Sequence, residues 1–343
     1  MKFVKFSGIE LADKEWHHGG EGRAGHILLD VMQKTGHTPI IVGGGTDRKR
    51  DYFGITCYPW DNTQEWDFQA DYLVLEHVDP YGYSPPLPEE LMERCSNNIL
   101  LFFWGLAHDW SKVDPRVKGV ILYTEEENKA LVDSCPVPVY RWHPYSPYQN
   151  FPYKGYIGNV LAWLGGNLMD YRLEYIDQFF SLWEEFVLTT NSTWYMDICR
   201  MDWLIKQGLL HELNEKIDQR ILRTPRTRYL PAYRYNDWLR YVSESSVFFA
   251  PNYTRTSQGI VEPALIGVPS ILSPHWAVPD DYVWTCHSLE EGFSHLRDIY
   301  RLSREHWGSD VYRVRDKLRD QLRPWYSLER STTEWQEICE LLH

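Results

Sequence analysis

The sequence predicts an α/β protein with two doubly wound domains, each built on a parallel sheet that helices cover on both faces. Three observations lead to this prediction. Short apolar runs alternate with amphipathic helical segments along the chain, which is typical of parallel sheets. The alternation stops once, in a proline- and aromatic-rich stretch at 135–155, and then restarts. The chain has 343 residues, more than one hydrophobic core usually holds.

The first domain, expected over 1–145, begins with a strand at 2–7. A polar, glycine-rich loop at 17–25 follows, and an amphipathic helix over 26–36 ends at Gly36. The rest of the domain alternates in the same way. Further strands are expected at 38–44, 71–78, 97–105 and 119–124, and a helix at 125–134.

The second domain, expected over 146–320, repeats the alternation after the crossing at 135–155. Its strands are expected at 156–166 with a glycine turn, and at 192–199, 245–251 and 267–272. Its helices are expected at 169–186, 235–246 and 259–267, with helical tracts at 287–307 and 310–342. The last segment, 321–343, is expected to return to the first domain as a helix.

One strand–loop–helix unit in the second domain suggests a binding site. The buried run at 245–251 leads into the polar loop NYTRTSQ and then into a short helix that Gly267 closes. In a parallel sheet such a loop lies at the carboxyl edge, where the helix start offers free N–H groups and a partial positive charge. This place suits an anion such as a diphosphate. Pro263 fits the helix only if it lies in the first turn.

Composition excludes several classes of protein. Hydrophobic residues make up 43% and charged residues 24% of the chain, the balance of a globular protein that folds by itself. The sequence shows neither an apolar run that could cross a bilayer nor a secretory signal, which predicts a soluble cytoplasmic protein. The six cysteines are scattered without a CxxC pair, so neither a zinc site nor a disulfide framework is expected.

The net charge of −13 argues against a broad surface for polyanions and leaves room for local basic patches. Two stretches are basic. The sequence at 47–50 is DRKR, and the stretch at 223–240 interleaves arginines with tyrosines. Each stretch has two interpretations. Its charges are solvated in a loop while its aromatic rings pack in the protein, or its basic residues bind phosphates.

The order of these pieces resembles that of GT-B glycosyltransferases. The matching pieces are the glycine loop after the first strand, TGHTPIIVG at the second, GVILYTEEENKAL, and SSVFFAPNYTRTSQGIVEPALIGVPSIL. The closing YSLERSTTEWQEI is similar to the tail helix of these enzymes. The resemblance covers nearly the whole chain. It implies two Rossmann-like domains that face each other across a cleft, C-terminal helices that pack back on the first domain, and transfer of a sugar from a nucleotide diphosphate.

A narrower resemblance is to bacteriophage enzymes that glucosylate hydroxymethylated cytosine in DNA. LLFFWGLAHDW resembles their strand followed by a His-Asp pair, here His108 and Asp109, and LAWLGGN resembles the start of their donor domain. Two positions depart from the family pattern. The arginine that the family has near Gly166 is absent, and the nearest cationic residue in the sequence is Arg172. Thr254 stands where the broader family has a glutamate. The resemblance implies a DNA acceptor and, for a chain of phage origin, the host cytoplasm.

The second domain is expected to bind the donor, a UDP-sugar by preference, with no cofactor beyond it. Metal-free transfer needs cations and helix N-termini that stabilise the leaving diphosphate. Glu262 is expected to accept hydrogen bonds from ribose hydroxyls, and its alternative role is to satisfy the helix dipole. The expected donor-binding residues are Arg255, Thr256, Ser257, Gln258, Gly259, Glu262, Arg172, Gly19 and Gly20.

The acceptor hydroxyl needs a base or an orienting carboxylate on the wall opposite the donor. Asp109 is the first candidate because it follows a buried strand and lies beside His108. Glu21 and His18, on the first glycine loop, come next. The alternative for His108 and His18 is that they are loop residues hydrogen-bonded to the backbone. The alternative for the loop glycines is that they only permit a tight turn. A metal site in this loop is not expected, because its spacing is not that of zinc ligands. The residues considered for it are His17, His18, Glu21 and His26.

The acceptor is expected to be a 5-hydroxymethylated pyrimidine base in DNA, and the alternative is a glycan, lipid or small molecule. An extruded base must enter a pocket, and aromatic side chains after the strand at 97–105 are expected to hold it. The basic stretch at 47–50 is expected to face the acceptor. The expected acceptor-binding residues are Arg48, Lys49, Arg50, Trp104 and Trp110.

Three functions remain open. The first, and the one we favour, is a nucleotide-sugar transferase. The second is a nucleotide-sugar epimerase or phosphorylase on the same architecture. The third is a non-catalytic binding protein that kept the fold, which the missing arginine and glutamate favour. No membrane or protein partner is expected.

Overall fold

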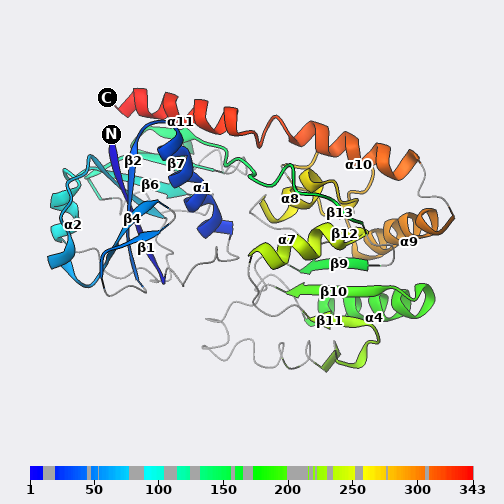
Figure 1. Cartoon of the computed structure of the whole chain (residues 1–343). Coiled ribbons are helices and arrows are strands. Elements are labelled where there is room, and N and C mark those ends of the chain that lie inside the picture. The colour runs from blue at the N-terminus through cyan, green and yellow to red at the C-terminus, as the bar shows by residue number, and fades with distance from the viewer. Residues whose placement is uncertain are drawn as a thin grey trace. The chain divides into compact units, whose positions relative to one another are not determined.

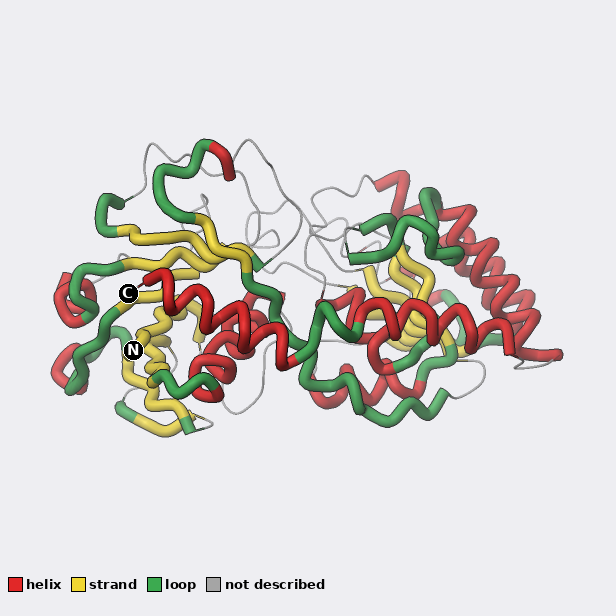
Figure 2. The backbone as a smooth tube through the Cα atoms, turned by 90° about the horizontal axis from the view of Figure 1, so that it is seen from above, coloured by secondary structure: helices red, strands yellow, loops and turns green. Residues whose placement is uncertain are grey.

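A computed structural model of the chain describes residues 1–10, 20–44, 48–52, 54–76, 89–103, 114–123, 132–155, 159–164, 173–198, 215, 219–220, 222–229, 235–251, 258–275, 277–305 and 309–342. The chain divides into two compact units, which are described separately (Figure 1). Unit 1 comprises Met1–Tyr145 and Trp325–His343, and unit 2 comprises Ser146–Pro324. Each unit has its own sheet, drawn in Figure 2 as yellow strands with red helices beside them. None of the described helices combines the length and the apolar character that crossing a bilayer requires.

Unit 1 is built on an eight-stranded sheet. Its strands are β1 (Lys2–Glu10), β2 (Thr38–Gly44), β3 (Arg50–Tyr52), β4 (Ile55–Pro59), β5 (Tyr72–Glu76), β6 (Ile99–Phe103), β7 (Val117–Leu122) and β8 (Val139–Arg141). Their order across the sheet is β3-β4-β2-β1-β5-β6-β7-β8. Among these described strands only β3 runs antiparallel to its neighbour. The carboxyl ends of the parallel strands therefore meet at one edge.

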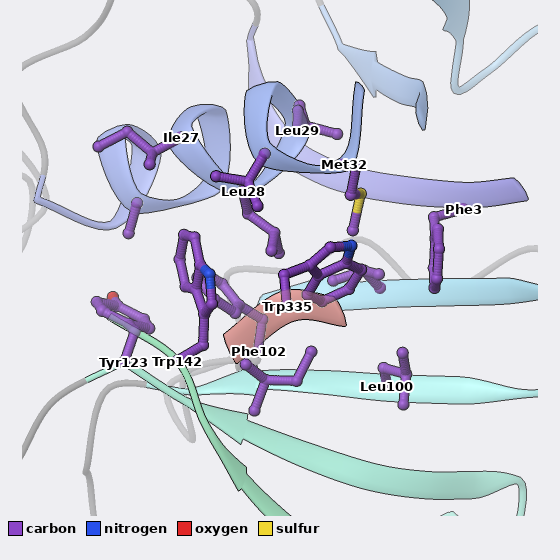
Figure 3. Packing of buried hydrophobic residues seen from close by; sticks show 14 of the residues in the cluster. Phe3, Ile27, Leu28, Leu29, Met32, Leu100, Phe102, Tyr123, Trp142 and Trp335 are labelled. Carbon is purple, nitrogen blue, oxygen red and sulfur yellow. The ribbon is translucent and has the colours of Figure 1, made fainter. Parts of the chain in front are cut away.

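Alternate residues of the unit 1 strands belong to two separate cores. The described α-helices of this unit are α1 (Gly20–Lys34), α2 (Glu89–Arg94) and α11 (Leu328–Leu342), and a short 3-10 helix covers Thr63–Glu65. Phe3 lies in the core that α1 and α11 cover, whereas Val4 lies in the core that contains Leu91 and Met92 of α2. Figure 3 shows the first of these cores, where Trp335 of α11 lies among side chains of α1 and of the strands. The C-terminal helix is thus part of the core of unit 1.

α1 begins earlier than the sequence predicts. Residues 20–25, expected in a loop, form its first turns. The buried Ala24 and Gly25 pack this end of the helix, and such tertiary packing overrides the low helix propensity of glycine. The helix ends as predicted, because Gly36 has a φ of 80° and the N–H of His37 donates to the carbonyl of Met32 at 2.9 Å.

β8 was not predicted, and it lies inside the stretch at 135–155 that was expected to be an irregular crossing. It pairs with β7 in parallel, with Tyr140 opposite Ile121. The absence of a side chain at Gly119 makes this pairing possible, since a Cβ there would lie 2.5 Å from the ring of Tyr140. β3 and β4 were not predicted either. Strands of three to five residues at a sheet edge show too little alternation to be recognised.

Unit 2 is built on a five-stranded sheet in which all described strands are parallel. Its strands are β9 (Asn159–Leu164), β10 (Thr193–Ile198), β11 (Thr227–Tyr229), β12 (Val247–Ala250) and β13 (Ser270–Leu272). Their order is β11-β10-β9-β12-β13. The direction of winding reverses between β9 and β12, and in doubly wound sheets ligands bind at such a switch point.

The two faces of this sheet carry different helices. The described α-helices of unit 2 are α4 (Leu173–Thr190), α7 (Tyr235–Glu244), α8 (Gln258–Ile266), α9 (Leu289–Glu305) and α10 (Ser309–Leu322). On one face Phe249 contacts the rings of Phe179 from α4 and Phe293 from α9. On the other face α7 and α8 contact β9 and β13. The first four of these helices lie where the sequence predicts them to within a few residues.

The last helical tract, expected to run over 310–342, is two helices. α10 ends at Leu322, just before Pro324, whose ring disfavours helix in the residue before it. α11 begins anew at Leu328, and the hydroxyl of Ser327 accepts a hydrogen bond from the N–H of Arg330 at 3.2 Å. The break lies where the chain passes from unit 2 to unit 1.

Candidate functional site

The candidate donor site lies at the switch point of unit 2. There β9 and β12 are neighbours, with Ala162 opposite Phe249. The buried Pro251 follows β12, and the chain enters α8 at Gln258. Of the other expected donor-binding residues, Arg255, Thr256, Ser257, Arg172 and Gly19 lie outside the described residues.

Glu262 lies on α8 and is 2% exposed. A carboxylate at that depth costs free energy unless specific partners satisfy it. It is the fifth residue of α8 as the structure describes the helix, and the first turn contains no acidic residue. Since the helix dipole acts mainly within the first turn, this position gives the dipole role of Glu262 little support, and its ligand role stays a prediction.

Pro263 lies inside α8, beyond the first turn, and the expectation of a first-turn position was wrong. Having no N–H, it cannot donate to the carbonyl of Gly259 four residues earlier. The carbonyl of Pro263 takes part in the end of the helix. It accepts hydrogen bonds from the N–H groups of Gly267 at 3.1 Å and Val268 at 2.9 Å. Gly267 has a φ of 98° and closes the helix as predicted.

Gly259, in the first turn of α8, lies directly against the indole of Trp163 from β9. Sequence reasoning assigned Gly259 to the donor site but missed Trp163. A local pattern could not have found this contact, because it joins two segments far apart in the chain.

Two further polar residues at this edge were missed, and both follow β13. Ser273 is 3% exposed, and its N–H donates to the carbonyl of Ala250 at 3.0 Å. His275 is 7% exposed, and its Nδ1 accepts a hydrogen bond from the N–H of Ala277 at 3.0 Å. In the neutral ring the proton therefore sits on Nε2. The sequence signal was SPH directly after a buried strand.

In sequence, the expected catalytic residues follow the strands β1 and β6 of unit 1. β6 ends at Phe103, and the segment with the His-Asp pair follows it. Gly20 and Glu21 open α1, where only the backbone is described. The residues His18, Trp104, His108, Asp109 and Trp110 lie outside the described residues. Within the part of the chain that the structure describes, no three His, Cys, Asp or Glu side chains come together as a metal site.

The basic stretch of unit 1 is partly neutralised by its neighbours. The Nζ of Lys49 lies 2.7 Å and 2.9 Å from the two carboxylate oxygens of Asp67 and 5.1 Å from the centre of the Tyr58 ring. The hydroxyl of Tyr58 also donates to Asp67. Arg48 is exposed, and Arg50 opens the edge strand β3. The stretch at 48–50 therefore presents less net charge than its sequence suggests.

These contacts shift the pKa values of Asp67 and Lys49. The hydrogen bond from Lys49, followed by that from Tyr58, lowers the pKa of the Asp67 carboxyl. The same hydrogen bond to Asp67 raises the pKa of Lys49. Both side chains are exposed, and water screens the pair. Lys49 and Asp67 are therefore both charged at neutral pH.

No protein-family model matches the sequence, and no curated protein matches it. Solved structures match along the whole chain. Sucrose-phosphate synthase from Thermosynechococcus elongatus has a TM-score of 0.65 at 10% identity, over 99% of this chain and 98% of that chain. An alpha-glucosyltransferase in complex with UDP has a TM-score of 0.61 at 14% identity, over 99% of both chains.

A further match is an alpha-glucosyltransferase in complex with UDP and a 13-mer DNA containing an HMU base. Its TM-score is 0.59 at 15% identity, over 99% of this chain and 98% of that chain. Identities this low concern the fold alone, and they confirm the predicted fold class. The chain has the α/β fold of the GT-B glycosyltransferases, with one doubly wound sheet in each of its two units.

Proposed function

We propose that the chain is a metal-independent glycosyltransferase that uses a nucleotide-diphosphate sugar, preferably a UDP-sugar. The observation that carries the proposal is the buried Glu262 on α8, the helix that begins next to the switch point of unit 2 and follows a polar, arginine-containing stretch of sequence. Support comes from the fold, since solved structures that share it hold UDP. Doubly wound sheets bind nucleotides at this place.

In this proposal residues at 255–257 stabilise the leaving diphosphate, and residues of unit 1 activate the acceptor hydroxyl. The acceptor oxygen forms a bond to the anomeric carbon, the bond from that carbon to the diphosphate breaks, and the diphosphate leaves with the electron pair. Arg255, the hydroxyls of Thr256 and Ser257 and the N–H groups at the start of α8 stabilise the charge that develops there. Asp109 takes the proton of the acceptor hydroxyl, and His108 assists it.

For the acceptor we propose the hydroxymethyl group of a modified pyrimidine base in DNA. The proposal rests on the resemblance of the segment that contains His108 and Asp109, and on the basic residues at 48–50. A further support is that one structure of the same fold holds DNA with an HMU base. Trp104 and Trp110 would stack on the extruded base.

The test is release of nucleoside diphosphate from a panel of UDP-, GDP-, dTDP- and ADP-sugars. Each donor is incubated alone, with duplex DNA that contains a hydroxymethylated pyrimidine, with the same duplex unmodified, and with glycans. Release that requires the modified duplex, and that Asp109→Asn abolishes, is the expected result. Release with glycans only would replace the acceptor. Conversion of the donor without an acceptor would indicate an epimerase, and absence of nucleotide binding would indicate a non-catalytic protein.

A further inference from the structure

The contact between Trp163 and Gly259 leaves no room for a side chain. A Cβ placed on Gly259 would lie 2.7 Å from Cη2 and 2.8 Å from Cζ2 of Trp163. Carbon atoms in favourable contact are about 3.5–4.0 Å apart. The backbone of α8 therefore approaches the indole as closely as a residue without a side chain permits.

The indole is itself held in place by the sheet. Trp163 is the fifth residue of β9, and it shares a face with Leu161, which lies opposite Phe248 of β12. The rings of Trp163 and Phe248 are stacked, with centroids 6.3 Å apart and planes 28° apart. Phe248 is fully buried. The indole cannot yield toward the sheet without displacing a core residue.

The contact with the indole lies one helical turn from Glu262. Gly259 and Glu262 are three residues apart, so they lie on the same side of the helix, one turn apart. Pro263 cannot donate to the carbonyl of Gly259, so the first turn lacks one of its own hydrogen bonds. Packing against Trp163 is then one restraint on this end of the helix.

We propose that Trp163 is a positioning residue for the donor. Its indole sets the distance of the first turn of α8 from the sheet, and through it the positions of the N–H groups and of Glu262 that contact the nucleoside diphosphate. Gly259 is required because any side chain there would push the turn off the indole. This inference rests on the proposed function, because it assigns a role at the same donor site.

The first test is Gly259→Ala, with UDP as the probe and its Kd measured by calorimetry. We expect the Kd to rise about tenfold or more, since loss of one hydrogen bond to a charged group weakens binding by about 10- to 100-fold. Phenylalanine lacks the outer ring atoms that the new methyl group would meet. Gly259→Ala combined with Trp163→Phe is therefore expected to recover most of the lost affinity. Trp163→Ala, which removes the support without a clash, should also weaken UDP binding and covers the case in which Gly259→Ala fails to fold.

Gly292→Ala is the matched control. A Cβ at Gly292 of α9 would lie 3.0 Å from Phe249 and 3.3 Å from Cys286, so it also crowds the core of unit 2, but on the face opposite Trp163. It should lower the melting temperature and leave the Kd for UDP unchanged. If wild-type protein binds UDP and Gly259→Ala binds it equally well, or if Trp163→Phe restores nothing, the inference is wrong. If wild-type protein binds no nucleoside diphosphate, the proposed function is wrong and this role of Trp163 with it.

Discussion

Glu262 is the residue on which the proposed donor site depends most. Its carboxylate is almost fully buried on α8 and lies beyond the first turn, where the helix dipole would stabilise it little. We expect the carboxylate to accept hydrogen bonds from ribose hydroxyls of the bound nucleotide, as an acidic residue does in dinucleotide sites.

Glu262→Gln keeps the shape of the side chain and removes its charge. We expect the Kd for UDP to rise by about 10- to 100-fold, because a hydrogen bond to a charged group contributes about 1.5–3 kcal/mol. Titrations with UDP, 2′-deoxy-UDP and 3′-deoxy-UDP measure the role directly. Wild-type protein should discriminate against at least one deoxy analogue, and Glu262→Gln should not.

The control for this experiment is Glu244→Gln, at the end of α7, whose partner is the surface residue Lys154 at 3.2 Å. It should bind all three nucleotides as wild-type protein does. Equal discrimination by wild-type protein and Glu262→Gln would show that the carboxylate does not read the ribose.

Lys49 is the residue that tests the acceptor proposal. Its ammonium shares its charge with Asp67, so removal of that carboxylate should strengthen its attraction for phosphates. We expect Asp67→Asn to tighten binding of duplex DNA, and Lys49→Met to weaken it and reduce the slope of log K against log salt by about 1. Salt titrations of DNA binding measure both effects. Lys34→Met is the control, because Lys34 pairs with Asp30 on α1. DNA affinity unaffected by either change would remove this stretch from the acceptor site.

At the scale of elements, α11 is attached to unit 1 by polar contacts as well as by its core side chains. Glu334 accepts hydrogen bonds from the backbone N–H of His143 at 2.7 Å and from Arg330 at 2.7 Å, and it lies 2.9 Å from the ring Nδ1 of His143. The indole of Trp142 donates to the carbonyl of Ser331 at 3.0 Å. The segment at 142–143 and the helix α11 are thereby joined just before the chain enters unit 2.

The Glu334 contacts predict a pH-dependent stability. Burial raises the pKa of the Glu334 carboxyl, but the hydrogen bonds and charge of His143 and the bond from Arg330 outweigh burial and lower the pKa below its ordinary value. A carboxyl with a lowered folded-state pKa stabilises the protein above its unfolded-state pKa, and this contribution is lost as the pH falls through the folded-state value. Glu334→Gln should therefore lower the free energy of unfolding at pH 7 by about 1–3 kcal/mol.

The difference from wild-type protein should shrink as the pH falls from about 5 to below about 4. Urea denaturation over this range measures it. Glu337→Gln, an exposed position on the same helix, is the control and should behave as wild-type protein at every pH. A deficit of Glu334→Gln that stays constant down to pH 3 would assign the effect to packing.

The elements that sequence reasoning found share strong local signals. The buried runs of β2, β6 and β12 and the closing glycines Gly36 and Gly267 are visible in any short window. The three-residue strands β3, β8 and β11 are not, because pairing with a neighbouring strand creates them. In the candidate donor site, the order of the strand β12 and the helix α8 could be predicted from the sequence. The contact of Trp163 with Gly259 and the place of Ser273 beside β12 were not, because they depend on which strands become neighbours.

At the scale of the whole molecule, each unit has a sheet and a core of its own, which predicts two separable unfolding transitions. Trp335 is fully buried in unit 1, and Trp183 is fully buried in unit 2. Replacing either by alanine should cost about 3–5 kcal/mol. In scanning calorimetry Trp335→Ala is expected to lower one transition and Trp183→Ala the other. These two variants serve as each other's control.

UDP then shows which unit holds the donor site. A ligand that binds only one folded unit stabilises that unit by mass action, by about 2.7 kcal/mol at a hundred times its Kd. Because α8 and Glu262 belong to unit 2, UDP should raise the transition that Trp183→Ala lowers and leave the Trp335-sensitive transition in place. If UDP raised the Trp335-sensitive transition alone, the donor site would belong to unit 1. A single transition that both tryptophan variants lower equally would mean that the two cores unfold as one cooperative body.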